Sequence, residues 1–546
     1  MYFKFFKRQY WDKRSAEDCR RNCAVLPLIS HFGFARMKTI AQPKPTGRQA
    51  ANAEYRMNSR TSGAALAFTV AFVLCPPEVH PEPQQWRAIM IHEKSFYRLF
   101  WRLAGTLILE QAVILSVNLA DNVMIGSYSE TALAGVAAVN MIQFVVQQIV
   151  YGLNNGMIVL SSQYWGQKRL EPIRALSAIG LLLEILFAVG MFVLATLCPQ
   201  WLVRLFVDDE AIIAEGVRYL RIIRFTYLFF AMTTILLGAM RSVETVRLAL
   251  VVSSVSLVVN CSMNFLLIPG RFGLPELGVR GAAIGTLTAR ILEFVLVCVY
   301  VFRFDKKLRL RLGDMLHLDR TLLKDFLRVD YPILVQAVIW GVSNAMQTAF
   351  LGHMAASAMT AYSISSTVFL LLKVTSVGAC TAASILVGKQ IGQGDGARLR
   401  SMVRTMQVMF LCIGLCLAAA LFIIRLPLLS MYQISDETYQ LASTFILIQC
   451  VVLFTMSYQM PVNAGILRGG GDTRYGMILD LISIWGIVLP VSYLAAFNWN
   501  WPPVAVVICL NADQVFKCVP AAIRVNRFHW INNLTRKDSA APQRAR

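Results

Sequence analysis

The 546-residue chain is too apolar for a water-soluble protein of this length, because 56% of its residues are hydrophobic and only 15% are charged. Its net charge of +21 could indicate a nucleic-acid partner, but the basic residues are spread over alternating polar segments and form no single patch. We therefore expect a membrane protein, with lipids and not nucleic acid as its surroundings.

Residues 1–95 differ from the rest of the chain. They are basic, contain Q-P-K-P-T-G and C-P-P-E-V-H-P-E-P, and have one apolar run, 64–75, of twelve residues. A spanning helix needs about 20 apolar residues, and no small-x-small cleavage site follows this run. We expect a disordered, basic cytoplasmic extension, and a second hypothesis is that translation begins at Met90.

From about residue 100 onward, twelve apolar runs are long enough to cross a bilayer as helices. The predicted spans are 103–126, 133–160, 175–198, 219–240, 248–269, 281–302, 332–352, 358–387, 405–425, 443–467, 476–497 and 502–522. The predicted fold class is therefore an all-α polytopic membrane protein with twelve transmembrane helices.

The second half of this region repeats the first at an offset of about 226 residues. The matches are Q-A-V-I at 111–114 with 336–339, Gly152 with Gly378, W-G-Q at 165–167 with I-G-Q at 391–393, and M-R-S-V-E-T-V-R at 240–247 with L-R-G-G-G-D-T-R at 467–474. Six spans in each half give both copies the same orientation, which is typical of transporters. We predict two pseudo-symmetric six-helix lobes, 96–310 and 311–525, around a central cavity, followed by a cytoplasmic tail at 526–546.

The loops predict the orientation. With a cytoplasmic N-terminus, the inner loops hold nineteen Lys and Arg residues and the outer loops hold five. Positive charge is enriched in cytoplasmic loops. We expect both termini to be cytoplasmic, in a monomer in the inner membrane of a bacterium.

Charges within the spans are few, and each costs about 2.5 to 3.5 kcal/mol on insertion scales unless it faces protein or water. Asp121 lies in the stretch V-N-L-A-D-N-V-M-I-G, and Glu110 precedes it by eleven residues on the same helical face. Asn260 and Asn264 share a face of the fifth span, where amides commonly connect packed helices. A buried carboxylate beside an amide can exchange a proton or hold Na⁺. The alternative for Asp121 is a helix-end residue that reaches the headgroups.

A second group of polar side chains could line the cavity for a substrate. Lys373 lies near the middle of the eighth span, where it forms either a hidden ion pair or a site for anionic groups. The other candidates are Gln143, Gln147, Asn154 and Arg290, of which Arg290 also has Glu293 as a nearby ion-pair partner. No catalytic, metal-ligand or phosphate-loop pattern accompanies them, so we expect no enzyme activity and no cofactor, and an ion gradient as the source of energy.

Four motifs together resemble the multidrug and toxic compound extrusion (MATE) family: A-D-N-V-M-I-G, Y-W-G-Q, the stretch 260–286 and L-R-G-G-G-D-T-R. The resemblance covers residues 96–530 and implies two pseudo-symmetric lobes and export by H⁺ or Na⁺ antiport. It also implies site residues. Asp121 matches the first-helix aspartate linked to cation coupling, Asn260 matches the asparagine that supports it, and Thr286 resembles a motif threonine. Many members have an aspartate where this chain has Asn264.

With one carboxylate in place of two, the site has less negative charge for Na⁺, which favours H⁺. Members with a second acidic site in the C-terminal lobe carry acids near the positions of Trp340 and Ser457, so we expect no second ion site. Within the family the chain is most similar to enterobacterial exporters associated with flavin nucleotides, which implies FMN or FAD as substrates. The alternatives are a lipid-linked precursor flippase of the related superfamily, a membrane-embedded enzyme and a channel.

Overall fold

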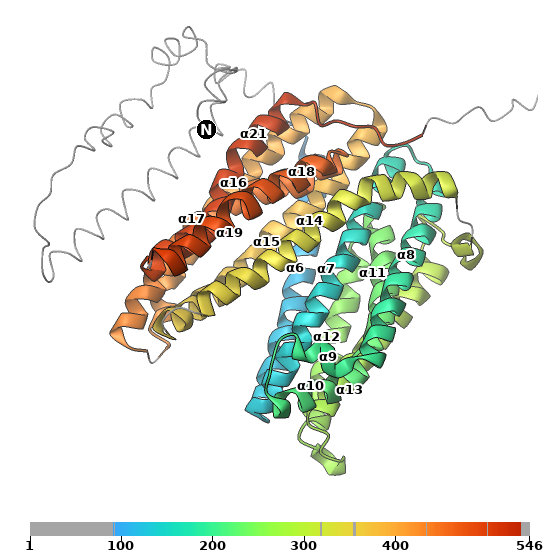
Figure 1. Ribbon diagram of the computed structural model, residues 1–546. Helices are drawn as coiled ribbons and strands as arrows, with labels where there is room; N and C mark the ends of the chain where they lie inside the picture. Colours follow the sequence, from blue (N-terminus) through green and yellow to red (C-terminus); the bar gives the residue numbers. More distant parts are fainter. Residues whose placement is uncertain are drawn as a thin grey trace, which may run out of the picture.

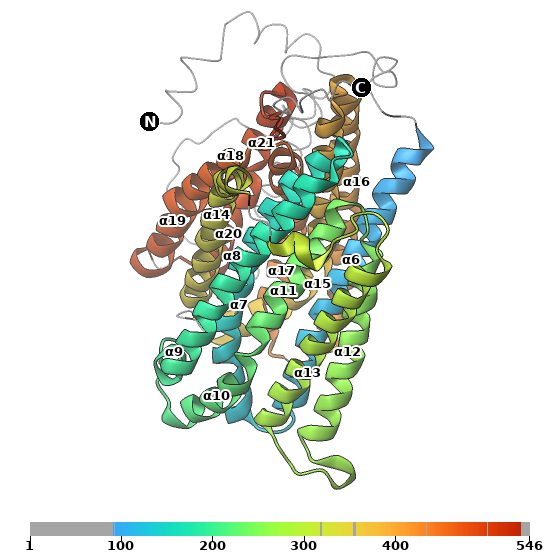
Figure 2. The ribbon, with the colours of Figure 1, turned by 90° about the vertical axis from the view of Figure 1, so that its right-hand side faces the viewer.

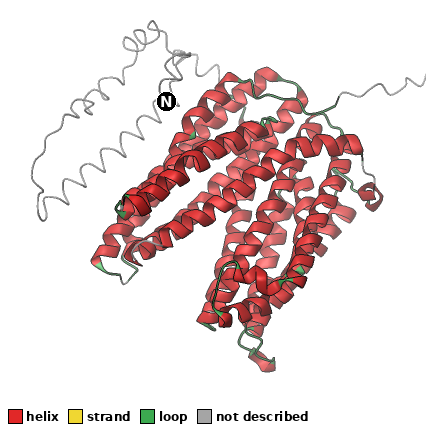
Figure 3. Ribbon diagram, in the orientation of Figure 1, coloured by secondary structure: helices red, strands yellow, loops and turns green. Residues whose placement is uncertain are grey.

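The computed structural model describes residues 91, 93–316, 319–352, 356–432, 434–499 and 501–536. These ranges are helical, with turns and no strand, as predicted (Figure 3). The expectation of a disordered extension at 1–95 concerns residues that lie almost entirely outside them.

Two sets of helices make up the described chain (Figure 1). The first set, the N-lobe, comprises α6 (Lys94–Gly126), α7 (Glu130–Gly166), α8 (Leu170–Leu197), α9 (Pro199–Arg204), α10 (Glu210–Ile223), α11 (Thr226–Ser242), α12 (Arg247–Leu267), η1 (Arg271–Gly273), α13 (Val279–Val299), η2 (Tyr300–Phe304) and, in the connection to the second set, η3 (Leu312–Leu316). The second set, the C-lobe, comprises α14 (Arg320–Gly352), α15 (Ala356–Gln393), α16 (Gly396–Leu429), α17 (Asp436–Met460), η4 (Pro461–Leu467), α18 (Thr473–Asp480), η5 (Leu481–Val488), α19 (Leu489–Tyr493), η6 (Leu494–Asn498), α20 (Pro503–Phe516) and α21 (Cys518–Arg527).

The number of membrane-spanning segments agrees with the prediction. Eleven helices of the described chain are long and apolar enough to cross a bilayer, and the bent pair α10 and α11 brings the number to twelve. The two helices of this pair meet at 50°. Asp209 caps α10 by accepting hydrogen bonds from the backbone N–H groups of Ala211 and Ile212. The predicted span 219–240 therefore begins inside α10 and crosses the bend.

The two lobes meet at one end of the molecule and diverge toward the other (Figure 1). We call the joined end, which carries the start of α6 and α21, the terminal face; the end that carries α9, α10 and η1 is the opposite face (Figure 2). Near the opposite face, each lobe has its own apolar core. Near the terminal face, both cores draw side chains from both lobes. The buried apolar surface that joins the lobes is therefore confined to the terminal half.

The lobes exchange the beginnings of their first helices. The start of α6 packs Phe100 and Leu103 into a core built mainly by the C-lobe. The start of α14 packs Phe326 and Val329 into a core built mainly by the N-lobe. This reciprocal packing is the three-dimensional counterpart of the sequence repeat.

The repeated glycines lie where the lobes touch. A side-chain carbon at Gly152 of α7 would come within 2.8 Å of Leu334, and one at Gly378 of α15 would come within 2.8 Å of the backbone nitrogen of Ile108. Both pairs obey the 226-residue offset, since 152 + 226 = 378 and 108 + 226 = 334. The second helix of each lobe therefore needs glycine so that the first helix of the other lobe can pack closely.

Polar contacts also hold the terminal face closed. The Gln163 side chain donates to the carbonyl oxygen of Asn532 (3.2 Å) and accepts from the backbone N–H of Leu534 (2.8 Å). Lys389 of the C-lobe pairs with Glu244 of the N-lobe at 2.5 Å. The segment after α21 thus crosses from its own lobe to α7, and separation of the lobes at this face requires these bonds to break.

The paired W-G-Q and I-G-Q motifs meet at this face and provide a test of the closed arrangement. A side-chain carbon at Gly392 would collide with the backbone carbonyl of Gln163 and lie 3.1 Å from the Cα of Gly166. We expect Gly392→Ala to lower the free energy of unfolding by about 1–3 kcal/mol through overpacking, measured as a lower apparent Tm of the purified protein. The matched control is Gly396→Ala, because nothing lies within 4 Å of a side chain there. Equal Tm values for the two variants would contradict this account of the contact.

Candidate functional site

Asp121 lies in a small polar group formed by α6, α12 and α13. The Asn264 side-chain amide donates to Asp121 Oδ1 at 2.6 Å, and it lies 3.5 Å from the side-chain oxygen of Asn260. Asn260 in turn donates to the Thr286 hydroxyl at 3.3 Å. The structure therefore brings together four of the five residues predicted for cation coupling.

This group has room and an unused acceptor. Asn260 and Asn264 are buried, whereas Asp121 is partly exposed. The side-chain oxygen of Asn264 has no hydrogen-bond partner and occupies the space that a side chain at Gly285 would fill. A carboxylate with one side open, next to a buried unpaired acceptor, can bind a proton or a small cation.

Glu110, the fifth predicted residue, does not join this group. Its carboxylate accepts from the guanidinium of Arg241, at the end of α11. Eleven residues of helix separate Glu110 from Asp121 by about 16 Å along the axis of α6. The partner of Glu110 comes from another helix, and it depends on tertiary structure that helical periodicity does not give.

Arg290 is placed with the Asp121 group and not with Lys373. It donates to Glu293 at 2.8 Å, as predicted, and its guanidinium stacks 5.1 Å from the ring centre of Phe230. It lies within electrostatic range of Asp121. The role predicted for Arg290 as a cavity residue therefore gives way to one as a charged neighbour of Asp121. Tyr219 of α10, which carries no distinguishing sequence signal, also lies close to Asp121.

Lys373 of α15 lies beside an aromatic pair formed by both lobes. Its ammonium group is 5.1 Å from the ring centre of Trp340, and that ring is 5.9 Å from the ring of Phe144 on α7. None of the salt bridges in the described chain includes Lys373. Its equivalent in the repeat is Gln147, since 147 + 226 = 373. Lys373 is thus a cation at the lobe boundary with aromatic rings beside it.

The α7 candidates separate into two kinds. Gln143 and Gln147 are half-buried. Asn154 is only 1% exposed, and its side-chain oxygen fills the space beside Gly238 of α11. Asn154 therefore packs inside the N-lobe and does not line a space between the lobes, a correction that only the position of α11 reveals.

The C-lobe contains a buried ion network in place of an Asp121-like group. Lys517 pairs with Asp513 at 2.9 Å, as the sequence spacing indicated, and also with Asp480 at 2.6 Å. Gln336 donates to Asp480 at 2.6 Å and accepts from Arg468 at 2.7 Å. These charges satisfy one another, which is the arrangement expected of a structural network.

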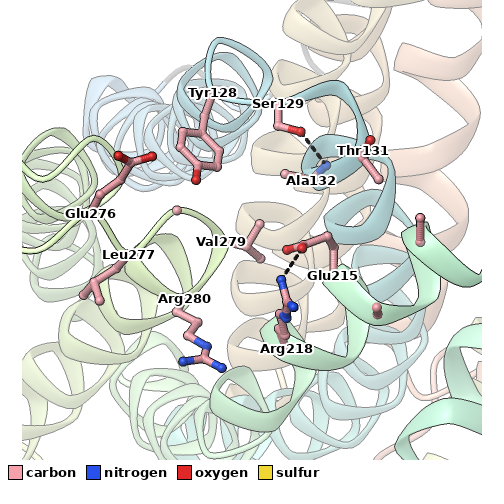
Figure 4. A pocket seen from close by; sticks show the side chains of 13 residues that line it. Tyr128, Ser129, Thr131, Ala132, Glu215, Arg218, Glu276, Leu277, Val279 and Arg280 are labelled. Atoms are coloured by element: carbon pink, nitrogen blue, oxygen red, sulfur yellow. Dashed lines mark hydrogen bonds and ion pairs between the residues drawn. The ribbon is translucent and has the colours of Figure 1, made fainter.

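A pocket of about 990 Å³ opens at the opposite face of the N-lobe, between the α6–α7 turn, α10 and the start of α13 (Figure 4). Glu215 and Arg218, one turn apart on α10, pair at its wall at 2.5 Å. A hydrogen bond to Glu276 raises the pKa of the Tyr128 hydroxyl. None of the Asp121 group lines this pocket, so it is not the candidate coupling site.

Comparisons with known proteins agree with this architecture. The MatE family model matches residues 106–266 and 332–494, one segment in each lobe. The probable multidrug resistance protein YoeA of Bacillus subtilis is 27% identical, over 66% of this chain and 79% of its own. The probable multidrug resistance protein NorM of Thermotoga maritima is 24% identical, over 75% of this chain and 87% of its own.

Solved structures show the same fold. The chain superposes on a mutant of the Vibrio cholerae MATE transporter VcmN with a TM-score of 0.73, at 17% identity, over 81% of this chain and 98% of that one. These proteins are transporters, and the chain is likewise not an enzyme. With the family model matched in both halves and the two-lobed helical fold present, the chain belongs to the MatE family of multi-pass membrane transporters.

Proposed function

We propose that the protein exports small aromatic molecules across the bacterial inner membrane in exchange for H⁺, with both termini in the cytoplasm. The observation that carries this proposal is the Asp121 carboxylate, which is hydrogen-bonded to Asn264 and forms no salt bridge within the described chain. A carboxylate at membrane depth that is not neutralised by an ion pair is expensive unless it binds a proton or a cation during the transport cycle.

Two features favour H⁺ over Na⁺. Na⁺ is held best by several oxygen ligands with net negative charge, and the group contains a single carboxylate. In addition, the guanidinium of Arg290 is close enough to act electrostatically on Asp121. A positive charge beside the site opposes a bound Na⁺, whereas a proton forms a covalent O–H bond and needs no shell of oxygen ligands.

The conformation fits alternating access. With cytoplasmic termini, the lobes are joined on the cytoplasmic side and diverge toward the outside. Rocking the lobes about the contacts near Gly152 and Gly378 would open the other side. The partly exposed Asp121 lies in the half of the N-lobe that faces outward in this orientation, from which protons would enter.

The substrate class is proposed from Lys373 and its aromatic neighbours. The cation of Lys373 and the rings of Trp340 and Phe144 lie in sequence across the lobe boundary. Such a set suits a planar aromatic ligand with an anionic group, such as FMN or FAD. The names of the relatives, which refer to multidrug resistance, make drugs the competing substrates.

The test is export from proteoliposomes under an imposed proton gradient, with a sodium gradient as the comparison. We expect proton-driven transport of FMN, and we expect Lys373→Ala to reduce FMN transport by about tenfold, which corresponds to about 1.4 kcal/mol at the site. Transport of uncharged riboflavin or a cationic dye should change less. Lys324→Ala, which removes an exposed lysine near the start of α14, is the control. Equal losses for all three compounds would indicate that Lys373 only supports packing.

A further inference from the structure

Two buried carboxyl groups from opposite lobes lie near each other without hydrogen-bond partners. Glu184 of α8 and Asp330 of α14 are each 0% exposed, and both oxygens of each carboxyl group are unpaired in the described structure. Asp330 is the charged group that acts on Glu184. Buried polar groups are nearly always hydrogen-bonded, so two neighbouring carboxyl groups without protein partners call for a proton or another ligand.

The surroundings are apolar and closely fitted. Asp330 fills space that a side chain at Gly156 of α7 would occupy. One turn before Glu184, Gly180 packs against Ile235 of α11. Arg468 is the charged group that acts on Asp330, but its guanidinium donates to Gln336 at 2.7 Å. Nothing in the described structure therefore neutralises the pair by direct contact.

The repeat shows that the fold does not require these acids. The equivalent of Glu184 is Phe410, since 184 + 226 = 410, and the equivalent of Asp330 is Ala104, since 330 − 226 = 104. Phe410 and Ala104 lie together in one apolar core. Where the first helix of the N-lobe meets the C-lobe, hydrocarbon side chains fill this position, and where the first helix of the C-lobe meets the N-lobe, two carboxyl groups fill it.

We propose that Glu184 and Asp330 form a proton-binding site at the lobe boundary, which holds at least one proton while the lobes are joined at the terminal face. Two buried carboxylates near each other cannot both be ionised without a large cost in free energy. A proton fits this pair better than a metal ion does, because no group of three or more His, Cys, Asp or Glu residues in the described chain could hold a metal ion.

The site is built by both lobes, so its state is linked to their contact. Asp330 lies on the part of α14 that packs against α7 and α8. When the lobes separate at the terminal face, both carboxyl groups meet water and can lose protons. Protonation therefore stabilises the joined state, and ionisation favours its opening. This last step rests on the proposed alternating access, whereas proton binding in the joined state does not.

The experiment uses the purified full-length protein without substrate or gradient. Infrared spectra recorded across a pH series should show a carbonyl band of protonated carboxyl groups, and Glu184→Gln and Asp330→Asn should each weaken that band. The matched control is Glu171→Gln, an exposed residue at the start of the same helix, which should leave the band unchanged. An undiminished band in both variants would overturn the proposal.

Thermal unfolding provides the second readout. The joined state binds more protons than the unfolded chain, so wild-type stability should fall as pH rises. The double variant should show a weaker pH dependence and a higher Tm than wild type at alkaline pH. A Tm lowered equally at every pH would instead mean that the carboxylates are ionised and structural. Asp121-dependent export plays no part in either readout, so the two proposals can fail separately.

Discussion

Asp121→Asn is expected to reduce proton-coupled export strongly while leaving substrate binding intact. The amide keeps the size of the carboxyl group and can still hydrogen-bond with Asn264, but it cannot gain or lose a proton. Coupling between two sites is typically worth about 1–3 kcal/mol, or a factor of about 5 to 150. We expect proton-driven accumulation in proteoliposomes to fall by a factor within this range, with the dissociation constant for substrate unchanged.

The control is Asp208→Asn, the same substitution at an exposed position of the opposite face. A second variant examines the choice of ion. Asn264→Asp would give the group a second carboxylate, and we expect transport then to respond to a sodium gradient. Substrate-dependent proton flux at the wild-type rate in Asp121→Asn would remove Asp121 from the mechanism.

The helical spans and the repeat could be predicted from the sequence because each depends on local composition. Apolar runs of about 20 residues identify bilayer helices without knowledge of their neighbours. The bend between α10 and α11 could not be predicted in this way, because both sides of it are apolar. The matched glycines could be seen as a sequence pattern. The structure shows why glycine is needed there, because each one contacts the first helix of the other lobe.

The residues of the candidate site likewise include some that could be predicted from the sequence and some that could not. The grouping of Asp121, Asn260, Asn264 and Thr286 could be predicted, because the sequence and the family resemblance gave their helices and their faces. Glu110 and Asn154 were misplaced because helical periodicity gives the face of a residue but not the helix it meets. Both meet α11, the helix that follows the unpredicted bend.

The two lobes also treat equivalent charges differently. In the N-lobe, Arg241 pairs with Glu110; in the C-lobe, its motif counterpart Arg468 reaches Asp480 through Gln336. In both lobes the first helix therefore contacts the arginine of the repeated motif. In the C-lobe, however, the Gln336 amide lies between Arg468 and the Asp480 carboxylate. Together with Asp121 and the Glu184–Asp330 pair, this asymmetry places acidic groups without full ion-pair partners in and beside the N-lobe.

Arg241→Met is expected to destabilise the protein by about 3–5 kcal/mol, because it leaves the buried Glu110 carboxylate without its counter-ion. One Glu110 oxygen and the Arg241 Nε already lack partners, so no other group can compensate. The apparent Tm in detergent should fall markedly. By comparison, Arg204→Met removes an ion pair whose side chains are 55% and 73% exposed, and it should cost less than about 1 kcal/mol.

The double variant Glu110→Met with Arg241→Met separates the cost of a lone charge from the value of the pair. Replacing both members of a buried ion pair by apolar residues of similar size is often neutral or stabilising. We therefore expect the double variant to recover most of the Tm lost in Arg241→Met. If it also retains proton-driven export, Glu110 has no part in coupling, and Asp121 acts without the partner that the helical face suggested. If stability returns but export is lost, Glu110 takes part in coupling, and the connection to examine is Glu293, which acts electrostatically on Glu110, and its partner Arg290, which acts on Asp121.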